Sequence, residues 1–395
     1  MAYRSFEQHL DPAVGPKRIL ALDGGGIRGV LTLGMLAEVE AVLKKRFNDD
    51  PAFRLGHYFD LIGGTSTGAI IAAALAIGMT VAEVREQYEK LGNAVFKPSI
   101  WRLGLVRQKF DAADVARALK SVFGDRTLAQ GDYLTGLMIM SKRLDTGSPW
   151  PLSNNPRARY FGVRPNANSP TIPNGEFPLW KVVRASSAAP YFFAPEHIDI
   201  ARADKARGLG AVKGEFIDGG VSTANNPSLQ LLLMATLEGF NFNWKVGPDE
   251  LLLVSLGTGK ADAAQGLSSG LMGVSAAHAM RALTSLMDDC GDMVETVMQW
   301  LSVSPTAREI DRETQFAQPT LAGAARLSYL RYNVLLDPKW CDKELGITRS
   351  AKELKALEAM DEPDNLAALY ELGSLAGQTL VKAGHFGARF DAGVN

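Results

Sequence analysis

The fold of this protein is decided by the stretch YFDLIGGTSTGAIIAAALAI, which occupies residues 58–77. Residues 58–62 are apolar apart from Asp60, which predicts a short buried strand. The glycine-rich segment 63–68 predicts a sharp turn, and the apolar residues 69–77 predict a helix. A strand, a tight turn and a helix in direct succession are the unit from which parallel α/β sheets are built.

A second unit of this kind lies upstream. The apolar run 18–22 ends in Asp23-Gly24-Gly25-Gly26, and apolar residues at helical spacing predict a helix over 30–47. Further buried strands are expected at residues 137–140, 216–217 and 251–254. This alternation predicts a three-layer α/β/α fold with a mostly parallel sheet, whose ligands bind beyond the carboxyl ends of the strands.

The rest of the chain is less regular. Proline and asparagine recur between residues 146 and 178, which predicts surface loops. After about residue 270 the pattern becomes helical, with one apolar stripe formed by Leu283, Leu286, Cys290, Met293, Val297 and Leu301. We therefore expect an N-terminal extension (1–16), an α/β domain (17–265) and a mainly helical region (266–395) packed on it.

Composition excludes several classes of protein. The 395 residues include 42 Lys and Arg against 43 Asp and Glu, and 46% are hydrophobic. This balance is that of a globular protein rather than a disordered or collagen-like chain, and it lacks the basic excess that binds nucleic-acid polymers. Two distant cysteines and five scattered histidines give no disulfide framework and no metal-ligand spacing.

The N-terminus carries no signal-peptide pattern, and the most apolar stretch, residues 68–79, is well short of the roughly 20 residues that span a bilayer. We expect a cytoplasmic protein whose membrane contact is at most peripheral.

Two segments match the pattern G-x-S-x-G, which is typical of a nucleophile elbow. One is Gly64-Thr65-Ser66-Thr67-Gly68, and the other is Gly266-Leu267-Ser268-Ser269-Gly270. The second follows a polar segment, whereas the first lies between a strand and a helix, where a strained turn exposes the hydroxyl. Ser66 is therefore the candidate nucleophile, and the alternative is a hydroxyl that only caps the helix.

Two other motifs follow strands. Gly24, Gly26 and Gly29 fit G-x-G-x-x-G, but the acid that would bind a ribose about 20 residues on is not at a strand end. Such a loop also offers backbone N–H groups to a phosphate or a transient oxyanion, or serves as a packing turn. The third motif is Asp218-Gly219-Gly220, which gains a catalytic meaning only if Asp218 meets Ser66.

Together, Asp23–Gly29, Gly64–Gly68 and Asp218–Gly220 resemble the three signature motifs of the patatin-like phospholipase family. Residues 184–190, 226–227 and 255–259 are similar to further stretches of that family. The likeness covers about residues 17–260, and the region after it matches no family motif.

The resemblance implies a lipid acyl hydrolase with a Ser–Asp dyad and no catalytic histidine. The sequence shows no calcium-binding loop of EF-hand type and the dyad chemistry needs no metal, so neither a metal nor a cofactor is expected. Ser66 would be the nucleophile and Asp218 the general base. The implied oxyanion-hole residues are Gly24, Gly25, Gly26, Ile27, Arg28 and Gly29. The implied elbow residues are Gly64, Thr65, Thr67 and Gly68, and the turn after the acid is Gly219 and Gly220. Arg28 would either meet a phospholipid headgroup or support the loop.

The implied substrate is a phospholipid or another acyl-ester lipid, met through transient membrane contact. Residues 96–103 are either an interfacial segment or core, and residues 191–193 either line an acyl pocket or are core. Some bacterial members of the family are effectors switched on by nucleotides or partners, so a regulatory ligand or a homo-oligomer is also considered.

Two alternatives stay open. A Ser–His–Asp triad could use His278 or His385, which follow Asp218 in the chain, whereas His197 precedes it. A non-catalytic nucleotide-binding module could be built on the glycine-rich loop.

Overall fold

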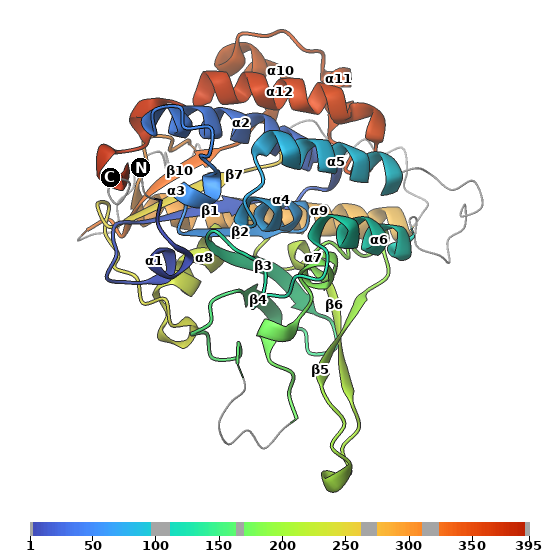
Figure 1. Cartoon of the computed structure of the whole chain (residues 1–395). Helices are drawn as coiled ribbons and strands as arrows, with labels where there is room; N and C mark the ends of the chain where they lie inside the picture. The colour runs from blue at the N-terminus through green and yellow to red at the C-terminus, as the bar shows by residue number, and fades with distance from the viewer. Residues whose placement is uncertain (1–2, 96–110, 163–169, 262–274, 310–323, 392–395) are drawn as a thin grey trace.

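The computed structural model describes residues 3–95, 111–162, 170–261, 275–309 and 324–391. Within them, nine strands form a central sheet in the order β5-β6-β3-β2-β1-β7-β10-β9, with β4 paired to β3 (Figure 1). The strands are β1 Lys17–Leu22, β2 Leu61–Thr65, β3 Gly136–Arg143, β4 Pro149–Ser153, β5 Glu196–Ala201, β6 Val212–Asp218, β7 Leu251–Leu256, β9 Ser302–Val303 and β10 Leu327–Tyr332. Neighbours from β3 through β9 pair in parallel, whereas β4 and β6 run antiparallel to β3, and β5 runs antiparallel to β6.

Both faces of the sheet are covered by helices. In β1, Leu20 and Leu22 belong to one hydrophobic core, and Ile19 and Ala21 belong to the other, because successive side chains of a strand point to opposite faces. The first face carries α2 Gly29–Arg46, α3 Leu55–Tyr58, α4 Thr67–Ala76, α5 Val81–Val95, α6 Ala112–Phe123 and α7 Leu179–Ser186. The second carries α1 Phe6–Leu10, α8 Ser228–Thr236 and α9 Ser275–Trp300. The predicted three-layer α/β/α architecture is confirmed.

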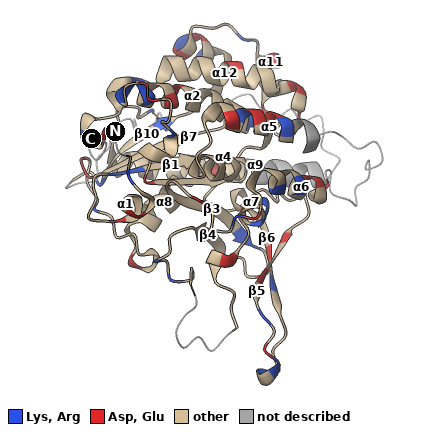
Figure 2. Cartoon of the chain, in the orientation of Figure 1, with Lys and Arg blue, Asp and Glu red and all other residues tan. Residues whose placement is uncertain are grey.

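A further layer of C-terminal helices lies outside α2. Its main member, α12 Leu366–Leu380, packs along α2, and the short helices α10 Pro338–Trp340 and α11 Ala351–Leu357 lie beside it (Figure 1). Two short strands, β8 Lys260–Ala261 and β11 Leu335–Leu336, pair with each other nearby. Figure 2 shows mixed charges along α5 but none on α4, which agrees with the deep burial of α4 behind the site.

The register of the strands brings the three predicted motifs together. Leu22 of β1 pairs with Gly64 of β2, so the loops that follow these two strands leave the same edge of the sheet. Thr65 pairs with Met140 of β3, whose next residue, Ser141, pairs with Asp218 at the end of β6. Ser66 and Asp218 are therefore neighbours although β6 approaches from the opposite direction.

Two local predictions are corrected. The strand expected over 58–62 is β2 at Leu61–Thr65, because the rings of Tyr58 and Phe59 anchor a helical turn in the core, 5.1 Å apart. The expected loop region 146–178 contains a strand, β4, that pairs only with β3 among the described strands. Pro149 and Pro151 lie two positions apart on it, so both face the same side of an edge strand, where a missing N–H is tolerated.

The C-terminal third also differs from its prediction. Its helices are confirmed, but β9 and β10 join the central sheet, which therefore draws on residues from both sides of position 265. In α9, Leu286 and Met293 of the predicted apolar stripe are 58% and 64% exposed. The buried side instead holds Val294 and Met298 together with polar Glu295 and Gln299, which periodicity alone assigns to the surface.

Candidate active site

Ser66 occupies a strained turn between β2 and α4. Its backbone has φ 55° and ψ −119°, in a region that residues with a side chain rarely adopt. The turn also requires close backbone packing: a Cβ atom on Gly64 would lie 2.1 Å from the Gly68 carbonyl oxygen, and one on Gly68 would lie 2.2 Å from the Leu22 carbonyl oxygen. The glycines of G-x-S-x-G are thus needed for the elbow geometry, as the sequence context predicted.

The Ser66 hydroxyl is hydrogen bonded to Asp218. Its Oγ donates to Oδ2 of Asp218 at 2.5 Å, and Oδ1 of the same carboxylate accepts the Gly220 N–H at 2.7 Å. The Ser66 backbone N–H donates to Oγ of Ser186 at 2.9 Å, a second hydrogen bond that holds the turn. Ser66 and Asp218 are only 8% and 4% exposed, so this contact is shielded from water.

The surroundings of Asp218 adjust its basicity. Burial raises the pKa of Asp218 to about 6, while hydrogen bonds from Ser66 and Gly220 and the positive charge of Arg184 act in the opposite direction. The carboxylate is therefore ionised at neutral pH and yet more basic than an exposed aspartate. Such a group can accept a proton from a hydroxyl that is attacking an ester.

The glycine-rich loop, residues 23–29, has most of its amides occupied. Gly24 N–H donates to the Asn225 carbonyl at 3.1 Å, and Ile27 N–H donates to the Met360 carbonyl at 2.8 Å. For the N–H groups of Gly25 and Gly26, no acceptor is found among the described residues. These two residues also line the cavity in front of Ser66. N–H groups without a protein acceptor at such a place can stabilise a developing negative charge.

A cavity of about 290 Å³ opens from Ser66 and Asp218. Its wall is mostly apolar and includes Ile70, Leu91, Val115, Phe192, Phe193, Met287 and Met360. Of the predicted aromatic segment 191–193, Phe192 and Phe193 thus line the cavity, whereas Tyr191 is 57% exposed. The arrangement provides room for an apolar chain beside the hydroxyl.

Arg28 lies at the end of the loop and is buried. Burial lowers its pKa, and the carboxylates of Asp288 and Glu358 oppose that shift. Arg28 is not among the residues that line the cavity.

Several predicted features lie elsewhere. His197 is exposed on β5, and Nδ1 of His385 contacts the Tyr332 hydroxyl at 2.9 Å. Of the histidines whose side chains are described, none lines the cavity. The second G-x-S-x-G match, residues 266–270, the segment 96–103 and the side chain of His278 lie outside the described residues.

Two searches were limited to the described chain. In it, no group of three or more His, Cys, Asp or Glu side chains is arranged to hold a metal ion. No helix of that part is both long and apolar enough to cross a bilayer.

The sequence assigned no role to several residues near the site, although Thr258, like Ser186, lies in a segment noted for its family likeness. The Tyr88 hydroxyl donates to the Gly26 carbonyl at 2.6 Å, and Thr258 donates to the Gly24 carbonyl at 3.0 Å. Ser186 belongs to a segment noted for its family likeness, but no role was predicted for it. Met360 comes from a region without any recognised motif, and only the tertiary structure identifies it.

Comparison with known proteins agrees with this geometry. The model of the family described as "Patatin-like phospholipase" matches residues 20–232. A cGAMP-activated phospholipase of Escherichia coli (strain TW11681) is 29% identical over 246 residues, covering 61% of this chain and 62% of the relative. A cGAMP-activated phospholipase of Vibrio cholerae is 31% identical over 222 residues, covering 53% of this chain and 55% of the relative. Patatin-17 of Solanum cardiophyllum is 28% identical over 255 residues, covering 61% of this chain and 60% of the relative.

The chain thus spans somewhat more than half of the length of these relatives. The family match covers more than half of the chain and contains the glycine-rich loop, the elbow around Ser66 and Asp218. The chain therefore belongs to the patatin-like phospholipase family.

Proposed function

We propose that this protein is a lipid acyl hydrolase in which Ser66 is the nucleophile and Asp218 the general base. The observation that carries the proposal is the 2.5 Å hydrogen bond from the Ser66 hydroxyl to the Asp218 carboxylate, at the base of an apolar cavity. A direct contact means that no histidine is needed to transfer the proton. The family membership and the names of the relatives, which are phospholipases and patatins, support the choice of a lipid ester as substrate.

The reaction proceeds in two steps. Ser66 Oγ attacks the ester carbonyl carbon while its proton passes to Asp218, and the carbonyl oxygen becomes an oxyanion near the Gly25 and Gly26 N–H groups. The intermediate then expels the alcohol portion of the lipid, which takes the proton from Asp218, and leaves an acyl ester on Ser66. A water molecule attacks this ester, gives a proton to Asp218 and releases the fatty acid; the proton returns to Ser66.

We propose two further properties of the same site. A lipid inside a bilayer must be reached from the membrane surface, and the exposed Tyr191 beside the cavity-lining Phe192 is the type of side chain that settles at such an interface. Two relatives are named as cGAMP-activated phospholipases, so a cyclic dinucleotide is the first regulatory ligand to test.

The test uses vesicles of mixed phospholipids, with lysophospholipids and free fatty acids quantified by mass spectrometry. The protein is assayed with and without cGAMP, so that a latent enzyme is not taken for an inactive one. We expect product release by the wild type and loss of on the order of 10⁴-fold or more in Ser66→Ala, with an unchanged circular dichroism spectrum.

The matched control is Ser268→Ala, which alters the other G-x-S-x-G match and should leave activity within about threefold. A folded Ser66→Ala variant that still releases products would remove Ser66 from this role.

A further inference from the structure

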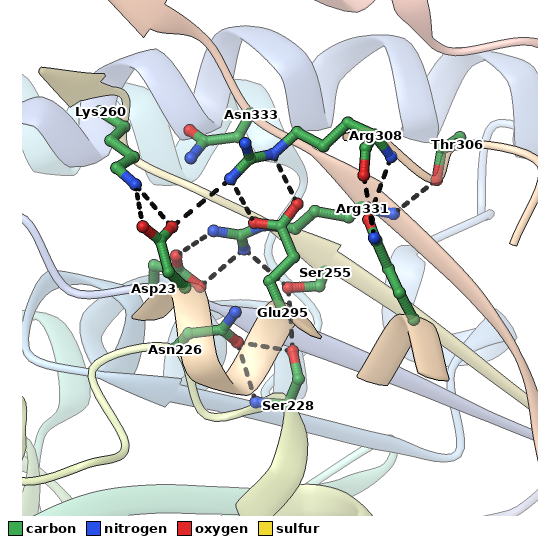
Figure 3. A network of polar contacts seen from close by, with 12 residues as sticks. Asp23, Asn226, Ser228, Ser255, Lys260, Glu295, Thr306, Arg308, Arg331 and Asn333 are labelled. Carbon is green, nitrogen blue, oxygen red and sulfur yellow. Dashed lines mark hydrogen bonds and ion pairs between the residues drawn. The ribbon is translucent and has the colours of Figure 1, made fainter. Parts of the chain in front are cut away.

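The first residue of the glycine-rich loop is held by an arginine that comes from far along the chain. Arg331 of β10 donates from Nη1 to Asp23 Oδ1 at 3.0 Å and from Nη2 to Asp23 Oδ2 at 2.6 Å (Figure 3). Both side chains are buried, and Arg331 also donates to Oγ of Ser255 at 2.8 Å. A guanidinium that grips both oxygens of a carboxylate fixes its orientation as well as its position.

These paired hydrogen bonds lie at the point where the loop leaves the sheet. The Asp23 N–H still bonds to the Leu256 carbonyl and extends the pairing of β1 with β7, and Gly24 and Gly25 follow directly. Asp23 is thus held at its backbone N–H by the Leu256 carbonyl and at its carboxylate by Arg331, which restricts rotation of the peptide planes that follow. A contact that fixes Asp23 in this way bears on the orientation of the peptide groups that follow it, those of Gly25 and Gly26 among them.

A second contact holds the other end of the segment. Gly26 has φ +59°, and a Cβ atom there would lie 2.3 Å from the Met360 carbonyl oxygen, the same oxygen that accepts the Ile27 N–H. Asp23 and Ile27 flank Gly25 and Gly26, and both are held by residues beyond position 300. Arg331 and Met360 lie outside residues 20–232, which match the family model.

Arg331 is also the inner end of a network of charges that runs outward from the loop (Figure 3). Its Nε lies 3.6 Å from Glu295 of α9, and Arg308 binds the same Glu295 with distances of 2.7 and 3.1 Å. Arg308 further pairs with Asp292 at 3.5 Å, and its side chain is 42% exposed. Arg308 therefore shares the network with Arg331 but bonds to α9 rather than to the loop.

We propose that Arg331 is a positioning residue that directs the Gly25 and Gly26 amides toward the oxyanion, by means of its paired hydrogen bonds to Asp23. The inference rests on the proposed function for its chemical meaning. It also assigns a role in the reaction to the C-terminal third, where no motif was recognised.

The test compares Arg331→Gln with the control Arg308→Gln on a soluble ester such as p-nitrophenyl butyrate. Titration with a fluorophosphonate to its end point counts intact Ser66 sites, so that unfolded protein does not lower kcat. We expect Arg331→Gln to lower kcat at least about tenfold with KM within about threefold, since displaced donors act on the transition state. Arg308 bonds to Asp292 and Glu295 of α9 rather than to the loop, so Arg308→Gln should keep both constants within about threefold of the wild type.

A second variant covers the case in which Arg331→Gln does not fold. Arg331→Lys keeps the buried charge but cannot bind both carboxylate oxygens, so we expect a folded protein with an intermediate kcat. The inference is overturned if the folded Arg331 variants keep the kcat of Arg308→Gln.

Hydrogen–deuterium exchange over residues 23–29 gives a readout that does not depend on activity. Exchange should be faster in the Arg331 variants than in Arg308→Gln, and equal exchange would also overturn the inference. A failure of the proposed function is recognised separately, because the wild type and Ser66→Ala would then be equally inactive.

Discussion

Replacement of Asp218 by asparagine should abolish activity and at the same time stabilise the protein at alkaline pH. Asparagine keeps the shape and hydrogen-bonding capacity of the side chain but cannot accept the Ser66 proton. It also removes a negative charge that is 4% exposed. Because burial raises the pKa of Asp218 to about 6, the folded state disfavours the ionised form that the proposed mechanism requires.

The size of the effect follows from this pKa. The change from the ordinary value of 3.8 to about 6 is about two pH units, or about 3 kcal/mol. Since the folded state binds the proton more tightly, the wild type loses this stability as pH rises from about 4 to about 6. Asparagine does not ionise, so residue 218 of the variant contributes no loss of stability over this pH range. By the linkage relation, the wild type has lost about half of this stability at pH 5 and nearly all of it at pH 8.

Urea unfolding at pH 5 and pH 8, followed by circular dichroism, measures the difference. We expect the free energy of unfolding of Asp218→Asn, relative to the wild type, to be about 1.5 kcal/mol higher at pH 8 than at pH 5. If the difference in free energy of unfolding between Asp218→Asn and the wild type is equal at both pH values, or larger at pH 5, the reasoning is refuted.

Asp60→Asn is the matched control, because Asp60 is buried but fully paired. Its carboxylate contacts Arg18 at 3.0 Å, Arg4 at 2.8 Å and His9 at 2.8 Å. Burial alone would raise the pKa of Asp60, but Arg18 and His9 outweigh it and hold the pKa well below its usual range. Asp60→Asn should therefore destabilise the protein at pH 8, by about 3–5 kcal/mol.

Two further predictions concern the same dyad. The kcat/KM of the wild type should rise with pH around a midpoint near 6, and Arg184→Gln should move that midpoint upward because the Arg184 charge lowers the pKa of Asp218; an unchanged midpoint would contradict this. His197→Ala, His278→Ala and His385→Ala should each keep at least a tenth of wild-type kcat/KM on a soluble ester, a barrier increase below about 1.4 kcal/mol. One folded histidine variant as inactive as Ser66→Ala would replace the dyad by a triad.

The meeting of Ser66 and Asp218 could be predicted from the sequence because its signals are local. A buried strand, a glycine turn and an apolar helix around Ser66 suffice to indicate an elbow, and Asp218 follows a strand in the same way. Strand ends in parallel sheets meet at one edge, so the two motifs could be expected to lie close together. Even so, the strand before Ser66 begins three residues later than predicted, because core packing of Tyr58 overrides the local pattern.

What could not be predicted depends on contacts between distant segments. Asp23 and Arg331 are 308 positions apart, and no spacing rule connects them. The same holds for α9, where Glu295 is buried because Arg308 and Arg331 neutralise it. A periodicity that treats every glutamate as exposed assigns the wrong face of this helix. Which loop N–H groups have an acceptor likewise depends on the tertiary structure, because Gly24 donates to the Asn225 carbonyl and Ile27 donates to the Met360 carbonyl.

Asp60 and Asp218 are both buried carboxylates, but their surroundings differ in how well they stabilise the ionised form. Asp60 is surrounded by cations and donors that satisfy it, so its burial strengthens the fold. At Asp218 the protein keeps a carboxylate whose ionisation the folded state disfavours, next to Ser66 with its strained backbone. Gly25 and Gly26, whose N–H groups have no acceptor among the described residues, line the same cavity. Each of these features costs stability, and they meet at one point of the sheet edge. Under the proposed mechanism, an ester would take up the proton-transfer pair formed by Ser66 and Asp218, and its transition state would supply an acceptor for the N–H groups of Gly25 and Gly26.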